Sequence, residues 1–168
     1  MVVGALARNV YLRPRSTNDS DFLVRTVADV KKLAAQTVQD FEQPVDVDVV
    51  TKLIHRDTGA TADIIVAEYL FEFEGMDRAT RFRVRDRSVR VMPPDYLAAM
   101  KVDAAGDPRR LHDFGEVAAL LLDGAADATH VEELIRRDLP RRLPTLQRIL
   151  EAVDRARNAP IPSGRGKQ

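Results

Sequence analysis

The chain has 168 residues, of which 45% are hydrophobic and 31% are charged, which predicts one globular domain and excludes a disordered or fibrous protein. It contains no cysteine, which excludes disulfides, thiolate metal sites and cysteine nucleophiles and favours a cytoplasmic location. No apolar run is of the kind that predicts a membrane span or a signal peptide. The 26 Lys/Arg balance the 26 Asp/Glu overall, but residues 1–77 hold 8 against 13 and residues 78–168 hold 18 against 13, which indicates either an acidic and a basic pole or a chance division of solvated charge.

The first part of the chain alternates short elements with polar loops. Residues 2–7 predict a short strand, a glycine turn and the start of a helix that ends before Pro14. Residues 19–24 have the two-residue alternation of a strand. Apolar residues then recur at helical spacing over residues 27–42, which predicts an amphipathic helix that ends before Pro44.

The next segment, from residue 45 to residue 74, is rich in β-branched and aromatic residues, which favour strands, and further strands are expected up to residue 92. Glycine, serine and aspartate interrupt the stretch up to residue 92 at two places that predict turns. We expect strands at 47–54 and 61–73, a hairpin turn at 75–77, a strand at 79–85, a turn at 86–88 and a strand at 89–92.

After residue 92 the hydrophobic period changes to that of helices. The fold class is therefore α+β, with an α/β core at 1–92, a helical part packed on it at 93–158 and a disordered basic tail at 159–168. We expect helices at 96–105, 109–123, 130–138 behind a capping box of Thr129 and Glu132, and 144–157.

Asp19 and Asp21 are the first candidate site residues. They are one residue apart on a predicted strand, so both side chains point to the same face, with Cα atoms about 6–7 Å apart. Two like charges on one face favour a divalent cation that prefers oxygen ligands, such as Mg²⁺ or Mn²⁺. The alternative is a chance pattern on a solvated strand.

Asp63 is a third candidate carboxylate. It lies in an apolar run on a strand that we expect beside the Asp19 strand. A carboxylate at the mouth of a buried strand needs partners, and a shared metal ion would supply them. The alternative is an aspartate that begins its strand and faces water.

The glycine turn and the loop before Asp19 have the residue types of a phosphate-binding segment. Gly4 and Ala5 allow close approach of the backbone to a ligand. Arg15, Ser16 and Thr17 add a guanidinium group and two hydroxyl groups, which together with backbone amides bind phosphate oxygens.

Two groups of these residues resemble a known family. The order of Gly4-Ala5, the Arg15–Asp21 segment and Asp63 is similar to the nucleotidyltransferase superfamily of the polymerase-β-like fold, whose pattern is a glycine turn followed by a paired-carboxylate strand. A second stretch, over about residues 91–120, is similar to the helical block of the AbiEii/AbiGii-type nucleotidyltransferase toxins. The residues that carry this second resemblance are Lys101, Arg109, His112-Asp113 and Glu116-Val117-Ala118-Ala119-Leu120.

The resemblance implies a small central mixed sheet with a C-terminal helical bundle. It also implies that Asp19 and Asp21 bind Mg²⁺ (or Mn²⁺) together with a nucleoside triphosphate (NTP), and that Asp63 is a candidate third ligand of the metal.

For the helical block, the resemblance implies that Lys101 holds the triphosphate and that Asp113 or Glu116 orients Lys101 or the acceptor hydroxyl. Arg15 and Thr17 would lie by the phosphates. Nucleotidyl transfer requires mainly positioning and charge neutralisation, so no nucleophile from the protein is needed.

Four arginines between residues 81 and 87 recur with period two, which on a continuous strand places them on one face as a cationic strip. Such a strip would bind an RNA backbone or an acidic partner. The alternative is cross-strand pairing with Glu72 and Glu74, at roughly 0.2–1 kcal/mol per pair. The strip consists of Arg81, Arg83, Arg85 and Arg87.

The sequence therefore predicts a metal-dependent transferase that moves a nucleoside monophosphate from an NTP to a nucleic-acid acceptor. The resemblance implies the 3′ end of tRNA as acceptor, growth arrest as the result and a cognate antitoxin as the protein partner. Transfer to a small hydroxylated molecule or to a protein hydroxyl, and a non-catalytic binding module of the same fold, remain alternatives.

Overall fold

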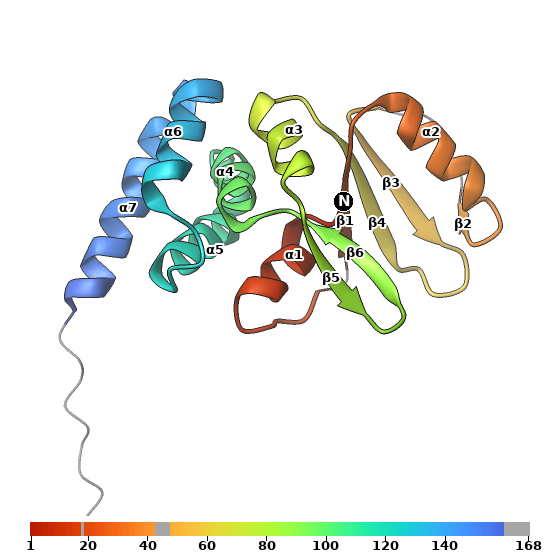
Figure 1. The fold of residues 1–168 in the computed structure, drawn as a ribbon, viewed down its shortest axis with the longest axis horizontal. Coiled ribbons are helices and arrows are strands. Elements are labelled where there is room, and N and C mark those ends of the chain that lie inside the picture. Colours follow the sequence, from red (N-terminus) through yellow and green to blue (C-terminus); the bar gives the residue numbers. More distant parts are fainter. Residues whose placement is uncertain (18, 43–47, 160–168) are drawn as a thin grey trace, which may run out of the picture.

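The computed structural model describes residues 1–17, 19–42 and 48–159 and has an α+β architecture (Figure 1). A mixed sheet and a β-hairpin occupy one side of the molecule, and the helices from the second half of the chain gather on the other. This arrangement confirms the expected fold class. Within the described ranges, no helix is long and apolar enough to cross a membrane.

The sheet has four strands in the order β1-β4-β3-β2. β1 (Asp19–Val24) pairs in parallel with β4 (Thr61–Val66), which confirms the expected neighbours. β3 (Val50–His55) is antiparallel to both β4 and the short β2 (Phe41–Glu42). The two faces of this sheet have different roles.

One face of the sheet is covered by α2 (Val27–Gln36) (Figure 1). Val30 of this helix forms a small apolar cluster with Leu53 and Ile64. The helix begins with a capping box in which Thr26 and the side chain of the third helical residue bind each other's backbone N–H groups. The opposite face of the sheet remains for the site described below.

The helix expected over 27–42 is shorter in the structure, because it ends at Gln36. Phe41 and Glu42 instead form β2 and pair with β3. The Phe41 ring lies edge-to-face against His55, with ring centroids 5.2 Å apart. This tertiary pairing outweighs the fit of Phe41 to the helical period.

The strand expected over 61–73 is confirmed only as far as residue 66, and the hairpin turn expected at 75–77 is wrong. β4 ends at Val66, and Leu70–Asp77 form the helix α3. The Glu72 carboxylate accepts two backbone N–H groups just before this helix, at 2.7 and 3.0 Å, and so fixes its start. Gly75 lies inside α3, where a Cβ would contact the neighbouring helix, so this glycine serves packing rather than a turn.

Residues 1–3 connect the sheet to the hairpin. The Val2 N–H donates to the Arg90 carbonyl at 2.8 Å, and the Val3 N–H donates to the Asp21 carbonyl at 2.9 Å. The helix α1 (Gly4–Tyr11) follows directly. The expected glycine turn and helix are therefore confirmed, whereas the expected short strand is reduced to isolated bridges from Val2 to Phe22 and Val91.

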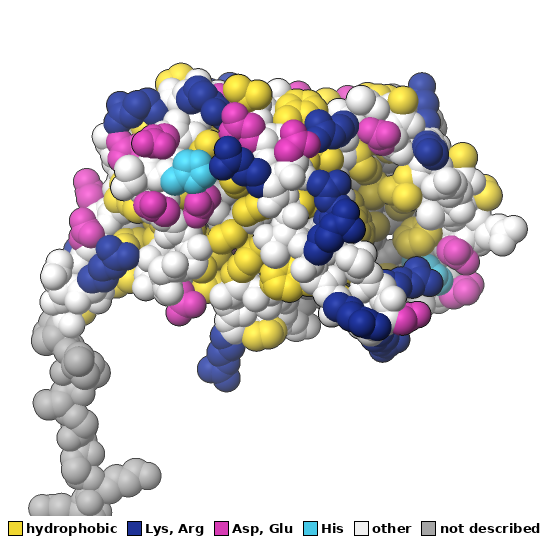
Figure 2. Space-filling model, viewed as in Figure 1, with side chains coloured by type: hydrophobic (Ala, Val, Ile, Leu, Met, Phe, Trp, Pro, Cys, Tyr) yellow, Lys and Arg dark blue, Asp and Glu magenta, His cyan; other side chains and the backbone are white. Residues whose placement is uncertain are grey.

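The hairpin consists of β5 (Thr80–Val84) and β6 (Arg87–Val91), close to the expected positions. Phe82 on its inner face lies edge-to-face against Tyr11 of α1, with ring centroids 6.0 Å apart. Its outer face is exposed, and Lys and Arg side chains lie over this region of the molecule (Figure 2).

The prediction that the four arginines between residues 81 and 87 form one continuous strip is wrong. Arg81 and Arg83 share the outer face of β5, but Arg85 lies in the turn with a positive φ of 54°. Arg87 is on β6 opposite Val84, on the other face of the hairpin. The period of two ends where the chain reverses, because the turn requires a left-handed residue there.

The alternative pairing of these arginines with Glu72 and Glu74 is also wrong. Both glutamates lie on α3. Glu72 is buried, and Glu74 forms an ion pair with Arg137 at 2.9 Å.

The C-terminal helices are confirmed to within about two residues at each end. Their bounds are α4 (Pro94–Ala104), α5 (Leu111–Leu122), α6 (Ala128–Asp138) and α7 (Leu143–Asn158), with short 3₁₀ turns before α5 and α7. The cap of α6 differs from the prediction, because Asp127 rather than Thr129 is the N-cap residue. Residues 160–168 of the expected tail lie outside the described residues.

The main apolar core joins these helices to the site face of the sheet. Leu97, Leu120 and Leu146 are fully buried in it, and so is Leu23 of β1. The core therefore fixes the position of α4 and α5 relative to β1.

Candidate active site

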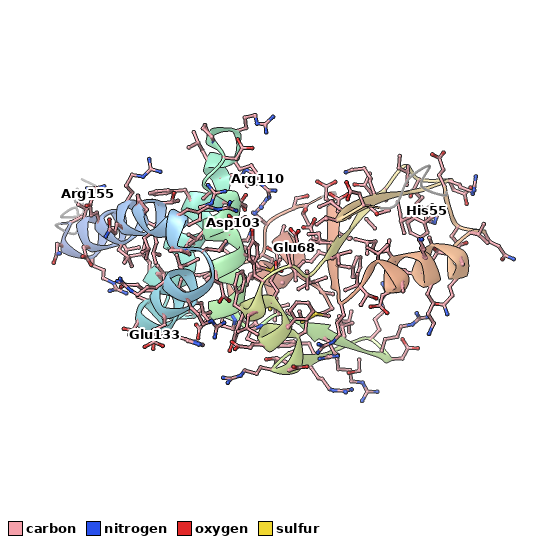
Figure 3. All side chains as sticks on the ribbon, turned by 90° about the horizontal axis from the view of Figure 1, so that it is seen from above. His55, Glu68, Asp103, Arg110, Glu133 and Arg155 are labelled. Atoms are coloured by element: carbon pink, nitrogen blue, oxygen red, sulfur yellow. The ribbon has the colours of Figure 1, made fainter. Side chains whose placement is uncertain are left out.

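A pocket of about 620 Å³ lies between the sheet and helices α4 and α5. Segments far apart in the sequence form its walls, including the start of α1, strands β1 and β4, the connection to α3, and the facing sides of α4 and α5. Viewed from above, Glu68 lies on the sheet side, with Asp103 and Arg110 on the helical side, and all three line the pocket (Figure 3).

The three predicted carboxylates form one wall of this pocket, which we call the acidic wall. Asp21 and Asp63 are direct neighbours in the parallel pairing of β1 and β4, so their side chains share a face. Asp19 lies two residues before Asp21 on the same face, and its carboxylate accepts a hydrogen bond from the Thr61 hydroxyl at 2.5 Å. The fold therefore brings together the acidic residues that the sequence singled out.

The start of α1 holds the Asp21 carboxylate. Gly4 has a positive φ of 60°, and a Cβ at this position would overlap the carboxylate of Asp21. The Ala5 backbone N–H, in the first turn of the helix, donates to the same carboxylate. The predicted glycine turn therefore exists, and in this structure it binds a carboxylate of the acidic wall.

The pKa of Asp21 is raised above its ordinary value, mainly because the carboxyl is buried and then because Asp63 carries the same charge. Lys101 and the Ala5 N–H act in the opposite direction and do not compensate fully. The ionised acidic wall is therefore short of positive charge.

Lys52 on β3 is a member of the site that the sequence analysis missed. It pairs with Asp63 in the β3–β4 register, and its ammonium lies 3.0 Å from the Asp63 carboxylate. The hydrogen bond to Asp63 raises the pKa of Lys52. Only the strand register, which depends on tertiary structure, could have identified this partner.

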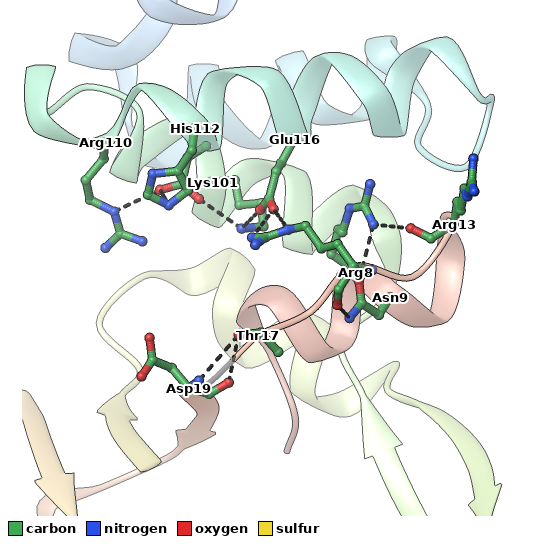
Figure 4. Close-up of polar contacts among 11 residues, drawn as sticks. Arg8, Asn9, Arg13, Thr17, Asp19, Lys101, Arg110, His112 and Glu116 are labelled. Atoms are coloured by element: carbon green, nitrogen blue, oxygen red, sulfur yellow. Dashed lines mark hydrogen bonds and ion pairs between the residues drawn. The ribbon is translucent and has the colours of Figure 1, made fainter. Parts of the chain in front are cut away.

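A charged cluster on α4 and α5 forms the facing wall (Figure 4). The Lys101 ammonium is buried and donates to Asp113 at 2.9 Å, and it also forms an ion pair with Glu116. Arg110 donates to Asp113 at 2.8 Å, and Arg15, from the loop before β1, donates to Glu116 at 2.7 Å. We call these residues the basic wall, because three cations surround two carboxylates.

Burial by itself would raise the pKa of both carboxyls in the basic wall, but their cations outweigh it. Lys101 and Arg110 hold the pKa of Asp113 below its ordinary value. Lys101 and Arg15 do the same for Glu116. Both carboxylates therefore stay ionised and hold the Lys101 ammonium in one position.

The loop residues predicted to bind phosphate are placed unequally. Arg15 and Thr17 line the pocket. The Thr17 hydroxyl accepts a hydrogen bond from the backbone N–H of Asp19 at 3.4 Å, so it also fixes the start of β1 (Figure 4). Ser16 is exposed and is not among the residues that line the pocket.

The acidic wall has the donor chemistry of a magnesium site. Among the described residues, no three carboxylate or imidazole groups already surround one point as an all-protein metal site does. Mg²⁺ usually takes only one or two carboxylates and completes its shell with water and substrate phosphates. Asp19 and Asp21 fit that requirement, and a cation beside them would relieve the like-charge repulsion that acts on Asp21.

Comparisons with known proteins add little to this geometry. No family model matches the chain, and no curated protein matches its sequence. An antigenic nucleotidyltransferase-like protein from Paracoccidioides brasiliensis has a similar solved structure, with 16% sequence identity and a TM-score of 0.47 over 90% of this chain and 83% of that chain. A likeness of this degree establishes neither family nor activity, so the chemistry of the site rests on its own residues.

Proposed function

We propose that this chain is a metal-dependent nucleotidyltransferase, which moves a nucleoside monophosphate from an NTP to a hydroxyl of a nucleic-acid acceptor. One observation carries the proposal. Asp19, Asp21 and Asp63 lie on one wall of a pocket whose facing wall holds the buried Lys101. A triphosphate with a divalent cation is a ligand that fits between a carboxylate wall and a cationic wall.

The cations of the basic wall have the role of binding the phosphate chain. Lys101 is held in place by Asp113 and Glu116, so it can neutralise charge without losing side-chain freedom on binding. Arg15 and Arg110 each use their Nε in an ion pair. Nη2 of Arg15 also lies in its ion pair with Glu116. Among the described contacts, Nη1 of Arg15 and both Nη atoms of Arg110 remain as donors for phosphate oxygens.

Asp19 and Asp21 are the residues that would hold the metal ion, with Asp63 beside them. A bound Mg²⁺ would supply Lewis acidity at the α-phosphate and neutralise charge on the leaving group. The Ala5 N–H and the Thr61 hydroxyl orient the two carboxylates from outside. Lys52 balances the charge of Asp63.

The reaction needs no covalent participation by the protein. The oxygen of the acceptor hydroxyl forms a bond to the α-phosphorus, and its proton leaves to water. The bond from the α-phosphorus to the oxygen that bridges it to the β-phosphate breaks, and pyrophosphate leaves. The side chains position the two reactants and stabilise the charge that develops on the phosphate oxygens.

The finer part of the proposal concerns the acceptor and the biological role. The resemblance of the Lys101–Leu120 block to the AbiEii/AbiGii-type toxins supports the 3′ end of tRNA as the acceptor. It also supports action as the toxin of a toxin–antitoxin pair, with a cognate antitoxin as the protein partner. Carboxylates outnumber cations in the lining of the pocket, so a polyanionic substrate would bind there together with divalent cations.

The proposal is tested by incubating the purified protein with each α-labelled NTP, Mg²⁺ and total tRNA, followed by a denaturing gel. We expect label on tRNA with the unmodified protein and none with the Asp19→Ala/Asp21→Ala variant. Asp154→Ala changes an exposed aspartate on α7 and serves as the matched control, with unchanged activity expected. Label on a small molecule or a protein instead of RNA would show that the proposed acceptor is wrong. No transfer with any NTP would refute the proposed transferase activity.

The toxin role has a separate test, which is induced expression in a bacterial host. The proposal expects growth arrest with the unmodified chain and normal growth with the Asp19→Ala/Asp21→Ala variant at equal protein level. Normal growth with both the unmodified chain and the variant would refute the toxin role. The transferase activity itself is tested separately by the labelling assay.

A further inference from the structure

A second pocket, of about 280 Å³, adjoins the first at Tyr69, whose side chain lines both. The rest of its lining comes from residues 138–141, where α6 ends and the turn before α7 begins. The reaction proposed above uses no residue of this second pocket. Its position beside the first suggests a place for a part of the substrate that does not react.

The ring of Tyr69 is held in a fixed plane. It stacks on Phe71 with ring centroids 5.7 Å apart and an interplanar angle of 6°. Phe71 is fully buried in the core, whereas Tyr69 is half-buried and reaches both pockets. An aromatic surface with this support keeps its orientation whether or not a ligand is present.

The backbone below the ring is fixed by two carboxylates. Glu72 accepts the N–H groups of Glu68 and Tyr69 at 2.7 and 3.0 Å. Asp138 of α6 accepts the N–H group of Phe71 at 2.8 Å, so it connects the start of α3 to the end of α6. Hydrogen bonds to ionised groups are stronger than those between neutral groups, so this segment is rigid.

Arg141 adds a cation at the edge of the ring. Its guanidinium donates to the Tyr69 hydroxyl at 3.2 Å, and the side chain is exposed. Nearby arginines are used differently, because Arg137 pairs with Glu74 and Arg142 pairs with Asp103. In the described ranges no carboxylate forms an ion pair with Arg141, so most of its donors are available to an anion.

We propose that Tyr69 and Arg141 bind the end of a single-stranded RNA acceptor, with a base stacked on the ring and a phosphate on the guanidinium, an inference that rests on the function proposed above. An aromatic ring beside a cation is the combination that single-strand binding proteins use, because each nucleotide has a flat base and a charged phosphate. The strand then reaches the first pocket past Tyr69. A protein hydroxyl as acceptor would bring neither a base nor a phosphate to these two groups.

The binding test uses a fluorescein-labelled single-stranded RNA of eight nucleotides and fluorescence anisotropy. We expect Tyr69→Ala to weaken binding by about 5- to 150-fold, the range for loss of one stacked base. Tyr69→Phe keeps the ring and should stay close to the unmodified protein. Thermal unfolding and Mg²⁺-dependent NTP binding are measured for each variant. Loss of the stacking on Phe71 should lower the Tm of Tyr69→Ala, so binding is measured well below that Tm, and its RNA affinity should fall more than its NTP affinity.

Arg141 is tested by the salt dependence of the same binding. Removal of one phosphate contact to a single strand should reduce the slope of log affinity against log salt by about 0.7. We expect this change for Arg141→Ala. Arg148→Ala removes an exposed charge on α7, away from both pockets, and should leave the slope unchanged.

The outcomes separate this inference from the proposed function. Weaker RNA binding with intact NTP binding supports the inference, even if the unmodified protein transfers no label, a result that would refute only the transferase activity. Loss of NTP affinity in Tyr69→Ala with unchanged RNA affinity overturns the inference, because the ring then belongs to the NTP site. RNA binding that neither substitution changes overturns it as well.

Discussion

Replacement of Lys101 by methionine is the most direct test of the electrostatics in the basic wall. Methionine fills a similar volume but removes the ammonium that Asp113 and Glu116 share. The two carboxylates are buried, so the loss cannot be compensated by water. Each keeps one arginine, from Arg110 or Arg15, which limits the damage.

The expected destabilisation is about 3 kcal/mol, at the lower end of the range for removal of one partner from a buried ion pair. For a chain of this size, that corresponds to a fall in Tm of roughly 6–12 °C. Lys52→Met is the matched control, because the Lys52 side chain is 53% exposed in its pair with Asp63. A solvent-screened pair of this kind contributes about 0–1 kcal/mol.

The loss of stability caused by Lys101→Met should depend on pH. In the unmodified protein the pKa values of Asp113 and Glu116 lie below their ordinary values of 3.8 and 4.5. Their stabilising effect is therefore complete above those values and is lost as the pH falls below them. Loss of Lys101 removes the main group that lowers the pKa of Asp113 and of Glu116, so both pKa values rise relative to the unmodified protein, and protonation at acid pH relieves the variant.

The assay is urea unfolding at pH 7 and at pH 4. The difference in unfolding free energy between the Lys101→Met variant and the unmodified protein should be smaller at pH 4. The triple variant Lys101→Met/Asp113→Asn/Glu116→Gln should recover part of the loss at pH 7, because no buried charge then lacks a partner. A difference that is the same at both pH values, or one no larger than that of Lys52→Met, would refute the argument.

Three further predictions concern the acidic wall and the hairpin. Gly4→Ala and Gly59→Ala both place a side chain at positive φ, which costs about 1–2 kcal/mol, but only at Gly4 would the Cβ overlap Asp21. Urea unfolding should therefore show the larger loss of unfolding free energy for Gly4→Ala. Equal losses would contradict the close approach of Gly4 to Asp21. Asp21→Asn should raise Tm in metal-free buffer at pH 7, because it removes a carboxylate whose pKa burial and a like charge have raised, and it should abolish any rise in Tm on addition of Mg²⁺; a lower metal-free Tm would contradict the repulsion. Arg81→Glu places an opposite charge across from Arg90 and should raise the unfolding free energy by about 0.2–1 kcal/mol at low salt, with the gain reduced in 1 M salt; a loss at low salt would show that the two arginines do not repel each other.

The sequence predicted the fold class and most elements, because their signals are local. The alternation at residues 19–24 and the proline-led helix after residue 93 both depend on residues close in the chain. The errors came where distant contacts decided the outcome. Residues 70–77 carry the aromatic residues of a strand, yet Glu72 and the neighbouring helices make them a helix.

The candidate site was predicted in part for the same reason. Asp19 and Asp21 follow from a short motif and Lys101 from a resemblance to a known family, and the structure places all three around one pocket. Lys52 and Tyr69 could not be found, because a strand register and a helix start bring them to the site. No local sequence pattern predicts that Lys52 or Tyr69 lies at the site.

The parallel pairing of β1 with β4 also has a kinetic consequence. It joins Asp21 to Asp63 across 42 positions of sequence, with a helix and two strands between them. The antiparallel β3–β4 pair closes a much shorter loop and so forms at lower entropic cost. The acidic wall is therefore complete only after the long-range pairing forms, and partly folded chains lack the place where a divalent cation would bind. A cation at this wall would then protect the chain mainly by slowing its unfolding, while the rate of folding would change little.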